Sequence, residues 1–241
     1  MKLDVLFSPV LTDELYYTGK TTVVIDVLRA STTIIAALKN GAKEIVPVAT
    51  VEFAVKLSGG IFGGQTLLGG ERNTKKIEGF ALGNSPAEYT GEVVNGKTIV
   101  FYSTNGSRAI VKAKYSRNNF ICSFNNISVL ANHLKELDQD ITVLCAGNNN
   151  FFSLEDALCA GKLILELTGG RKKNELTDSS VAAITLFKNF GKDIYKTLVE
   201  TEHGQLLMKN GYSEDLKACS ELNNVDIIPF YSGNAIKVLK D

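Results

Sequence analysis

An acidic, a basic and two hydroxyl side chains follow one another at the end of an apolar, β-branched run at residues 22–28. Asp26 lies near the end of this predicted strand, and Arg29, Ser31 and Thr32 come next, at the expected start of a helix. Free backbone N–H groups and the helix dipole favour a phosphate there, and an arginine can bind that phosphate through two hydrogen bonds. The turn is therefore a candidate anion site, with the alternative that Ser31 or Thr32 only caps the helix.

A second polar turn follows the predicted strand at residues 98–102. It contains Thr104, Asn105 and Gly106, and it again leads into a predicted helix. In open sheets of parallel strands, ligands bind at the carboxyl ends of the strands, where such turns gather. The two turns together indicate a shared anion site.

The stretch between these turns is rich in glycine, with six glycines in residues 59–70. Glycine weakens regular structure and lets the backbone approach a ligand closely. The polar side chains that this stretch would present are Glu71, Arg72, Asn84 and Ser85. Three of the five arginines of the chain lie in this stretch and the two turns, and arginine suits bidentate recognition of phosphate, carboxylate or sulfonate groups.

Carboxylates follow three of the predicted strands, namely Asp26, Glu71 and the adjacent pair Glu155 and Asp156. Two adjacent residues cannot share one helix face, so we predict that at most one of the pair points inward. We take Asp156 as the candidate and leave Glu155 as the alternative. A parallel sheet would bring Asp26, Glu71 and Asp156 to one edge, where they could hold Mg²⁺ together with substrate oxygens. The alternatives are that the pair is a solvated first helical turn and that Asp26 forms a salt bridge with Arg29.

The chain has only two histidines and four cysteines. Two histidines argue against a histidine-rich zinc or copper site, so any metal should be a hard ion held by oxygen. His133 lies at helical spacing among leucines and is predicted to be a core-edge residue, whereas His203 on a later helix is a candidate catalytic residue. The cysteines form no C-x-x-C pair and are predicted to be buried and reduced, which fits a cytoplasmic setting.

The composition restricts the partners. The 26 basic residues balance 26 acidic ones, which argues against nucleic-acid binding through a broad basic surface. No run of 18 apolar residues occurs, which argues against a membrane partner. The expected partner is a small anionic phosphate ester, and the sequence leaves open whether the chain forms a homo-oligomer.

Short β-branched runs alternate with amphipathic stretches, which predicts an α/β fold with three α/β/α layers and a mainly parallel or mixed sheet. The strands are expected at residues 3–7, 22–28, 44–48, 66–69, 98–102, 120–124, 141–145 and 225–230. Extra helices are expected in the C-terminal third, at residues 154–168, 177–190 and 193–209, followed by a short fourth one. We predict one domain over residues 1–241 and leave open whether residues 151–222 form a helical subdomain.

Six segments of the chain resemble the 2-phosphosulfolactate phosphatase family, in the same order. They are DVLRASTTIIAAL, GERNTKKIEGFALGNSPAEY, STNGSRA, CAGNNNFFSLEDALCAG, EHGQLL and DLKAC. The similarity extends over about residues 21–230, which is nearly the whole chain. Gln205 stands where the family tends to carry arginine, which leaves the exact anion preference open.

The resemblance implies a Mg²⁺-dependent phosphoric monoester hydrolase that converts 2-phospho-3-sulfolactate, or a related ester, to 3-sulfolactate and phosphate in coenzyme M biosynthesis. The candidate catalytic residues are Asp26, Arg29 and His203. The candidate substrate-binding residues are Arg29, Ser31, Thr32, Arg72, Asn84, Ser85, Thr104, Asn105 and Gly106, and the candidate metal ligands are Asp26, Glu71 and Asp156. Leu28 replaces the second aspartate of an aspartyl-phosphatase signature, which favours attack by water. The alternative is a non-catalytic binding protein for an anionic phospho-metabolite.

Overall fold

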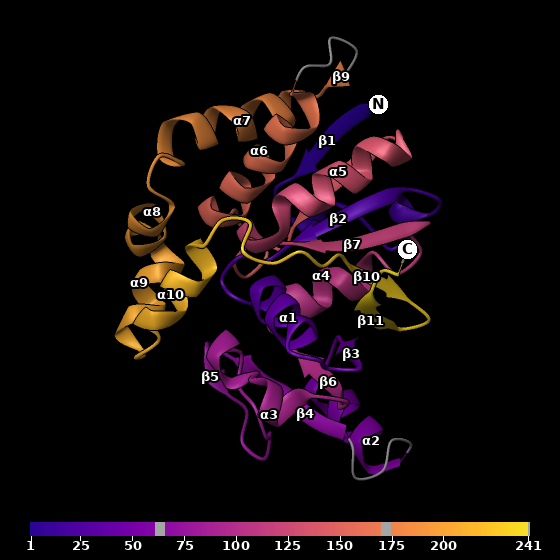
Figure 1. Cartoon of the computed structure of the whole chain (residues 1–241), viewed down its shortest axis with the longest axis vertical. Coiled ribbons are helices and arrows are strands. Elements are labelled where there is room, and N and C mark those ends of the chain that lie inside the picture. Colours follow the sequence, from indigo (N-terminus) through magenta and orange to yellow (C-terminus); the bar gives the residue numbers. More distant parts are fainter. Residues whose placement is uncertain (61–65, 170–174, 241) are drawn as a thin grey trace.

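A computed structural model of the chain describes residues 1–60, 66–169 and 175–240. The strands are β1 (Lys2–Leu6), β2 (Thr21–Ile25), β3 (Glu44–Val48), β4 (Thr66–Arg72), β5 (Lys75–Lys76), β6 (Thr98–Tyr102), β7 (Asn118–Cys122), β8 (Ile141–Cys145), β9 (Glu175–Leu176), β10 (Pro229–Ser232) and β11 (Ala235–Val238). Within the described ranges they form one mixed sheet with the order β5-β4-β6-β3-β11-β10-β7-β2-β8-β1-β9 (Figure 1).

Two groups of parallel strands make up most of this sheet. The β3 group contains β3, β4 and β6, and the β2 group contains β1, β2, β7, β8 and β9. The hairpin β10–β11 lies between them and pairs antiparallel with β7 on one side and with β3 on the other. Because three successive antiparallel pairings separate β3 from β7, the two groups run in opposite directions.

Helices cover both faces of the sheet. They are α1 (Ala30–Lys39), α2 (Val51–Gly60), α3 (Gly91–Val94), α4 (Gly106–Lys112), α5 (Ile127–Leu137), α6 (Leu154–Thr168), α7 (Asp178–Phe190), α8 (Ile194–Glu200), α9 (Glu202–Lys209) and α10 (Ser213–Ser220). In β2, Val23 and Ile25 pack in the core under α5, α6 and α7, whereas Val24 packs in the core under α1 and α4. The strand is thus buried on both faces, as parallel strands usually are. The predicted three-layer α/β/α fold is confirmed.

Most of the expected elements match, and three need correction. The strands at residues 44–48, 98–102 and 141–145 and the helix at 154–168 have the expected bounds. The last strand lies later than expected and is the first arm of the hairpin β10–β11. The single helix expected at residues 193–209 is broken at Thr201 into α8 and α9. Helix α1 begins at Ala30, so Ser31 and Thr32 lie inside its first turn, and neither is its cap.

Two further expectations concern the state of the cysteines and helices that could span a membrane. All four cysteines are unpaired and buried, as expected. Among the described residues, no helix combines the length and the apolar character that a membrane crossing requires. Residues 61–65 of the glycine-rich stretch lie outside the described residues.

Candidate active site

A cavity of about 100 Å³ lies where the turns that follow β2, β4, β6 and β8 meet helix α9. It is lined by Asp26, Leu28, Arg29, Glu71, Asn73, Thr74, Asn84, Thr104, Asn105, Asn148, Asn149, His203 and Leu206. On the same volume scale, a cavity that holds a single buried water needs roughly 10–15 Å³. The cavity therefore has room for a small ligand.

Asp26 and Glu71, which we expected at one edge of the sheet, both line this cavity. The reason differs from the one expected, because the two residues do not follow strands of one parallel group. Asp26 follows β2, whereas Glu71 lies at the end of β4, in the group that runs in the opposite direction. The cavity forms where the carboxyl ends of both groups meet.

Asp26 is a buried carboxylate of the cavity, 6% exposed. Its Oδ1 accepts the backbone N–H of Ala30 at 3.2 Å. Burial raises the pKa of Asp26 to about 6, the nearby His203 opposes this rise, and the negative charges of Glu71 and Glu155 add to it. An acid with a pKa near neutrality is suited to exchanging a proton or to meeting a cation.

Three predicted substrate-binding residues shape the turn around Asp26 and do not line the cavity. Ser31 Oγ accepts the backbone N–H of Asp26 at 2.9 Å, and Thr32 Oγ1 donates to the carbonyl of Val27 at 3.0 Å. Gly106 leaves room for the carboxylate, because a Cβ at this position would lie 2.4 Å from Asp26 Oδ2. These residues position the acid.

Glu71 holds two turns of the cavity wall. One of its carboxylate oxygens accepts the backbone N–H of Thr74 and the other accepts that of Thr104, both at 2.7 Å. Each oxygen keeps a further lone pair, since a carboxylate offers about four acceptor sites. Glu71 can therefore hold these turns and still contact a ligand.

Asp156 performs a similar task behind the cavity. Its Oδ1 accepts the N–H of Val27 at 2.8 Å and its Oδ2 accepts the N–H of Gly147 at 3.0 Å. Burial raises the pKa of Asp156 well above its ordinary value, and the charges of Asp26 and Glu155 raise it further. Unlike Asp26 and Glu71, it is not among the described residues that line the cavity.

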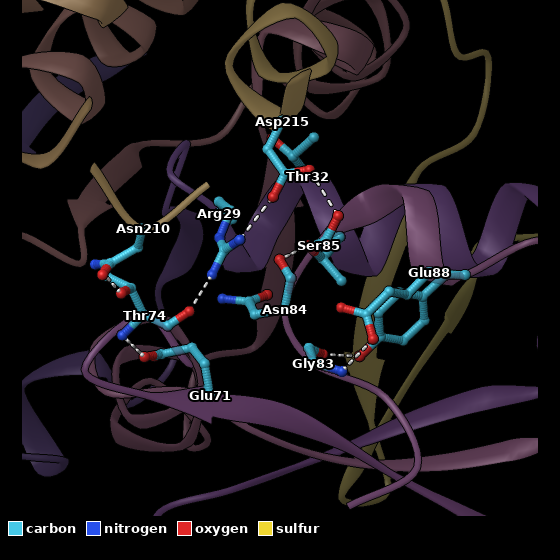
Figure 2. A network of polar contacts seen from close by, with 12 residues as sticks. Arg29, Thr32, Glu71, Thr74, Gly83, Asn84, Ser85, Glu88, Asn210 and Asp215 are labelled. Carbon is cyan, nitrogen blue, oxygen red and sulfur yellow. Dashed lines mark hydrogen bonds and ion pairs between the residues drawn. The ribbon is translucent and has the colours of Figure 1, made fainter. Parts of the chain in front are cut away.

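Arg29 lines the cavity, but its two terminal nitrogens already have protein partners. Nη1 donates to Asp215 Oδ2 at 2.6 Å and Nη2 donates to the carbonyl of Thr74 at 2.7 Å (Figure 2). The guanidinium carbon lies 4.1 Å from the ring centre of Tyr212. Arg29 thus forms its ion pair with Asp215. The alternative that Arg29 forms a salt bridge with Asp26 is wrong. The peptide bond between Leu28 and Arg29 is cis.

Two polar atoms of the cavity lining have no hydrogen-bond partner in the part of the chain that the structure describes. Asn84 Oδ1 and Thr104 Oγ1 are buried and without a hydrogen bond to any described residue. A buried polar group left unpaired costs roughly 1–3 kcal/mol, which a ligand in the cavity would relieve. Ser85, next to Asn84, is instead engaged with Asp215, to which its Oγ donates at 2.6 Å (Figure 2).

His203 of α9 completes the cavity on its helical side. Its Nδ1 lies 3.5 Å from Glu155 Oε1. Burial lowers the pKa of His203, but the contact with Glu155 and the charges of Asp26 and Glu71 outweigh it, so that the pKa lies above its ordinary value. His133, in contrast, packs against Phe120 with ring centres 5.3 Å apart, as expected for a core-edge residue.

The remaining predicted residues divide into one that lines the cavity and one that does not. Asn105 lines it, and its Oδ1 accepts the N–H of Asn149 at 3.0 Å, which joins the turns after β6 and β8. Arg72 is exposed and is not among the described lining residues. The sequence reasoning missed Thr74 and Asp215. Asp215 lies in the first turn of α10, where acids are common, so no local signal distinguished it.

A family model described as "2-phosphosulpholactate phosphatase" matches residues 7–234. The chain belongs to the 2-phosphosulfolactate phosphatase family. Members of this family are phosphoric monoester hydrolases, and the resemblance inferred from the sequence is thereby confirmed.

Similar proteins named "Probable 2-phosphosulfolactate phosphatase" include one from Caldanaerobacter subterraneus subsp. tengcongensis, 39% identical over 92% of both chains. One from Clostridium acetobutylicum is 39% identical over 98% of this chain and 100% of its own. One from Symbiobacterium thermophilum is 38% identical over 92% of this chain and 95% of its own. The family likeness therefore covers the cavity and all the turns that form it.

The charges of the cavity suit a hard cation. Arg29 is balanced by Asp215 and His203 faces Glu155, which leaves Asp26 and Glu71 without a matching cation among the described contacts. Among the described residues, no three His, Cys, Asp or Glu side chains are arranged to hold a metal by themselves. Mg²⁺ needs only one or two carboxylates when waters and substrate oxygens complete its shell. Asp26 and Glu71 fit this requirement.

Proposed function

We propose that the chain is a Mg²⁺-dependent phosphatase that hydrolyses 2-phospho-3-sulfolactate, or a related phosphate ester of a 2-hydroxycarboxylic acid, as in coenzyme M biosynthesis. One observation carries the proposal. The carboxylates of Asp26 and Glu71, whose negative charges no cation among the described contacts balances, line the same small cavity as the unpaired atoms Asn84 Oδ1 and Thr104 Oγ1. A divalent cation would balance the two acids. Thr104 Oγ1 could then donate to an anionic ester, and Asn84 Oδ1 could accept from a water molecule on the cation. Membership of the family supports the choice of ester.

In the proposed reaction, a water oxygen bonds to phosphorus while the bond from phosphorus to the C2 oxygen breaks. Mg²⁺, held by Asp26 and Glu71, would neutralise phosphate charge and acidify the attacking water. The contact with Glu155 helps to raise the pKa of His203 above its ordinary value, which favours its protonated form. Since its Nδ1 faces Glu155, its Nε2 can give a proton to the departing oxygen. Thr104 Oγ1 can donate to the phosphate.

The first test is release of phosphate from 2-phospho-3-sulfolactate and from phospholactate, with Mg²⁺ and with EDTA. We expect turnover that EDTA abolishes and added Mg²⁺ restores. Turnover that continues in EDTA would contradict the Mg²⁺ assignment. Absence of turnover together with ester binding that survives EDTA would favour the non-catalytic binding protein.

A pair of variants tests the position of the substrate. Thr104→Val removes a hydroxyl that lines the cavity, and Thr66→Val removes an equally unpaired hydroxyl from a residue that does not line it. A hydrogen bond to a charged group contributes about 1.5–3 kcal/mol, so Thr104→Val should lower kcat/KM by about 10- to 100-fold. Thr66→Val should leave kcat/KM unchanged. Equal effects of the two substitutions would remove Thr104 from the substrate site.

A further inference from the structure

A chain of hydrogen bonds beside the cavity, three of them buried and one partly buried, joins three segments that are distant in sequence (Figure 2). Asn210 Nδ2 donates to Thr74 Oγ1 at 2.9 Å, and the carbonyl of Thr74 accepts from Arg29 Nη2 at 2.7 Å. Arg29 Nη1 donates to Asp215 Oδ2, and Ser85 Oγ donates to Asp215 Oδ1, both at 2.6 Å. Asp215 accepts two of these four bonds, one on each oxygen of its carboxylate.

The ion pair at its centre is almost completely removed from solvent. The side chains of Arg29 and Asp215 are 2% and 5% exposed. Removing two charges from water costs so much that a buried ion pair is weak evidence for stability, and a well-packed apolar pair often stabilises a protein as much. The pair is therefore better explained by the geometry that it imposes on its neighbours.

The backbone of Thr74 shows what this geometry is needed for. Thr74 has φ +69°, in the left-handed region that a β-branched residue rarely adopts, and it follows Asn73 with φ +53°. Such a conformation persists only where the surrounding contacts hold it. Glu71 accepts its N–H, Arg29 donates to its carbonyl and Asn210 donates to its hydroxyl. Each polar group of Thr74 is thus held by a different segment.

We propose that Asp215 is a positioning residue of the active site, which through Arg29 and Ser85 fixes where Thr74 and Asn84 stand around the substrate phosphate. This inference rests on the proposed function for the identity of the ligand. Asp215 acts on the groups that bind the anion, whereas His203 is held separately by Glu155. Changes at Asp215 should therefore alter binding more than the chemical step.

The test compares Asp215→Asn and Asp215→Glu with the unmodified chain. Asp215→Asn should raise KM for the ester and Kd for inorganic phosphate by about tenfold or more, because small displacements of positioning groups have large effects. The change in kcat should stay below about threefold. Asp215→Glu keeps the charge but is one methylene longer, so it should shift KM and Kd in the same direction by a smaller factor. It also serves if the buried, unpaired Arg29 prevents Asp215→Asn from folding.

Glu214→Gln is the matched control on the same helix. Glu214 is 77% exposed and pairs with Lys217, so its substitution should leave KM, Kd and kcat unchanged. A readout independent of activity is amide hydrogen exchange, which should quicken in residues 73–76 and 84–86 of the Asp215 variants and not in β2 or β8.

The outcomes separate this inference from the proposed function. If the unmodified chain releases no phosphate from any ester, the proposed function fails, while phosphate binding and hydrogen exchange still test Asp215. A folded Asp215→Asn protein with unchanged KM, phosphate affinity and hydrogen exchange would overturn the inference. An equal loss of kcat and rise in KM in both Asp215 variants would also overturn it, because Asp215 would then not act selectively on binding.

Discussion

The buried carboxylates around the cavity differ in what their oxygens contact. Both oxygens of Glu71 and both oxygens of Asp156 accept backbone N–H groups, which holds the turns in place. Asp26 accepts a single backbone N–H, at the longer distance of 3.2 Å. Burial raises the pKa of Asp26 to about 6. Its ionised form is destabilised until a cation is present.

The first prediction follows from the sign of this pKa change. The folded chain binds the proton of Asp26 more tightly than the unfolded chain, so without divalent metal the free energy of unfolding should fall as the pH rises from about 4 to about 6. A rise of about 2 pKa units corresponds to about 3 kcal/mol. Asp26→Asn should thus be more stable than the unmodified chain by up to that amount at pH 8 in EDTA, and equally stable near pH 4. Urea unfolding across this pH range measures the difference.

The exposed Asp226 provides the control for this experiment. Asp226→Asn should leave the pH dependence of the unfolding free energy as it is. His203 contributes in the same sense but at higher pH, because its raised pKa stabilises the fold below pH 6.5 and this contribution is lost as the pH rises through the raised pKa. The difference between Asp26→Asn and the unmodified chain removes most of that contribution. No gain in stability at pH 8 would show that the carboxylate of Asp26 is ionised at little cost.

At the scale of elements, strands were easier to predict than their neighbours in space. Strands β2, β6 and β8 are buried on both faces, so each is a largely apolar run that a single sequence reveals. The turn between β10 and β11 also has a local signal, since Gly233 and Asn234 both have positive φ, as a two-residue hairpin turn requires. That signal was present in the sequence and was overlooked. The pairing of β11 with β3 has no local signal.

The same distinction applies to the candidate site. Asp26, Glu71 and the polar turns could be predicted because ligands gather at strand ends. The contact of Arg29 with Asp215 could not, because it spans 186 residues of sequence and depends on how α10 packs. Which of the carboxylates lines the cavity also depends on packing. The sequence alone therefore could not show that Asp156 lies behind the cavity and does not line it with Asp26.

The break between α8 and α9 leads to a prediction about the N-terminal cap of α9. Thr201 Oγ1 accepts the N–H of Gly204 at 3.0 Å and so caps α9, the helix that carries His203 and Leu206 to the cavity. Thr201→Ala should lower the free energy of unfolding by about 1 kcal/mol. Because α9 would lose its fixed start, kcat/KM should also fall by about tenfold or more. Urea unfolding and steady-state kinetics measure the two effects.

Asp193→Ala is the matched control for loss of a cap. Asp193 caps α8 by accepting the N–H of Lys196 at 3.0 Å, and no residue of α8 is among those that line the cavity. This substitution should cost a similar free energy of unfolding and leave kcat/KM unchanged. If both variants lose activity in proportion to their stability, α9 has no special role in positioning His203.

At the scale of the whole molecule, the cavity gathers turns from both groups of strands, which one sheet holds together. The hairpin β10–β11 makes this connection, with Phe230 opposite Phe120 of β7 and Ile236 opposite Ile45 of β3. Figure 1 shows the hairpin next to the C-terminus, beside strands of both groups. A substitution in the hairpin should therefore affect both groups together if residues 1–241 form one cooperative domain.

The last prediction tests this cooperativity with two neighbouring residues of β11. Ile236 is completely buried, whereas the Lys237 side chain is 58% exposed and forms an ion pair with Glu44. Ile236→Ala removes buried apolar contacts and should lower the free energy of unfolding by roughly 2–5 kcal/mol. Lys237→Ala loses only a surface ion pair and should cost less than about 1 kcal/mol. In both proteins urea unfolding should remain a single transition with an unchanged m-value, because the hairpin is shared by both groups of strands. Two separate transitions in Ile236→Ala would instead mean that the two groups fold independently, with the active site at the boundary between them.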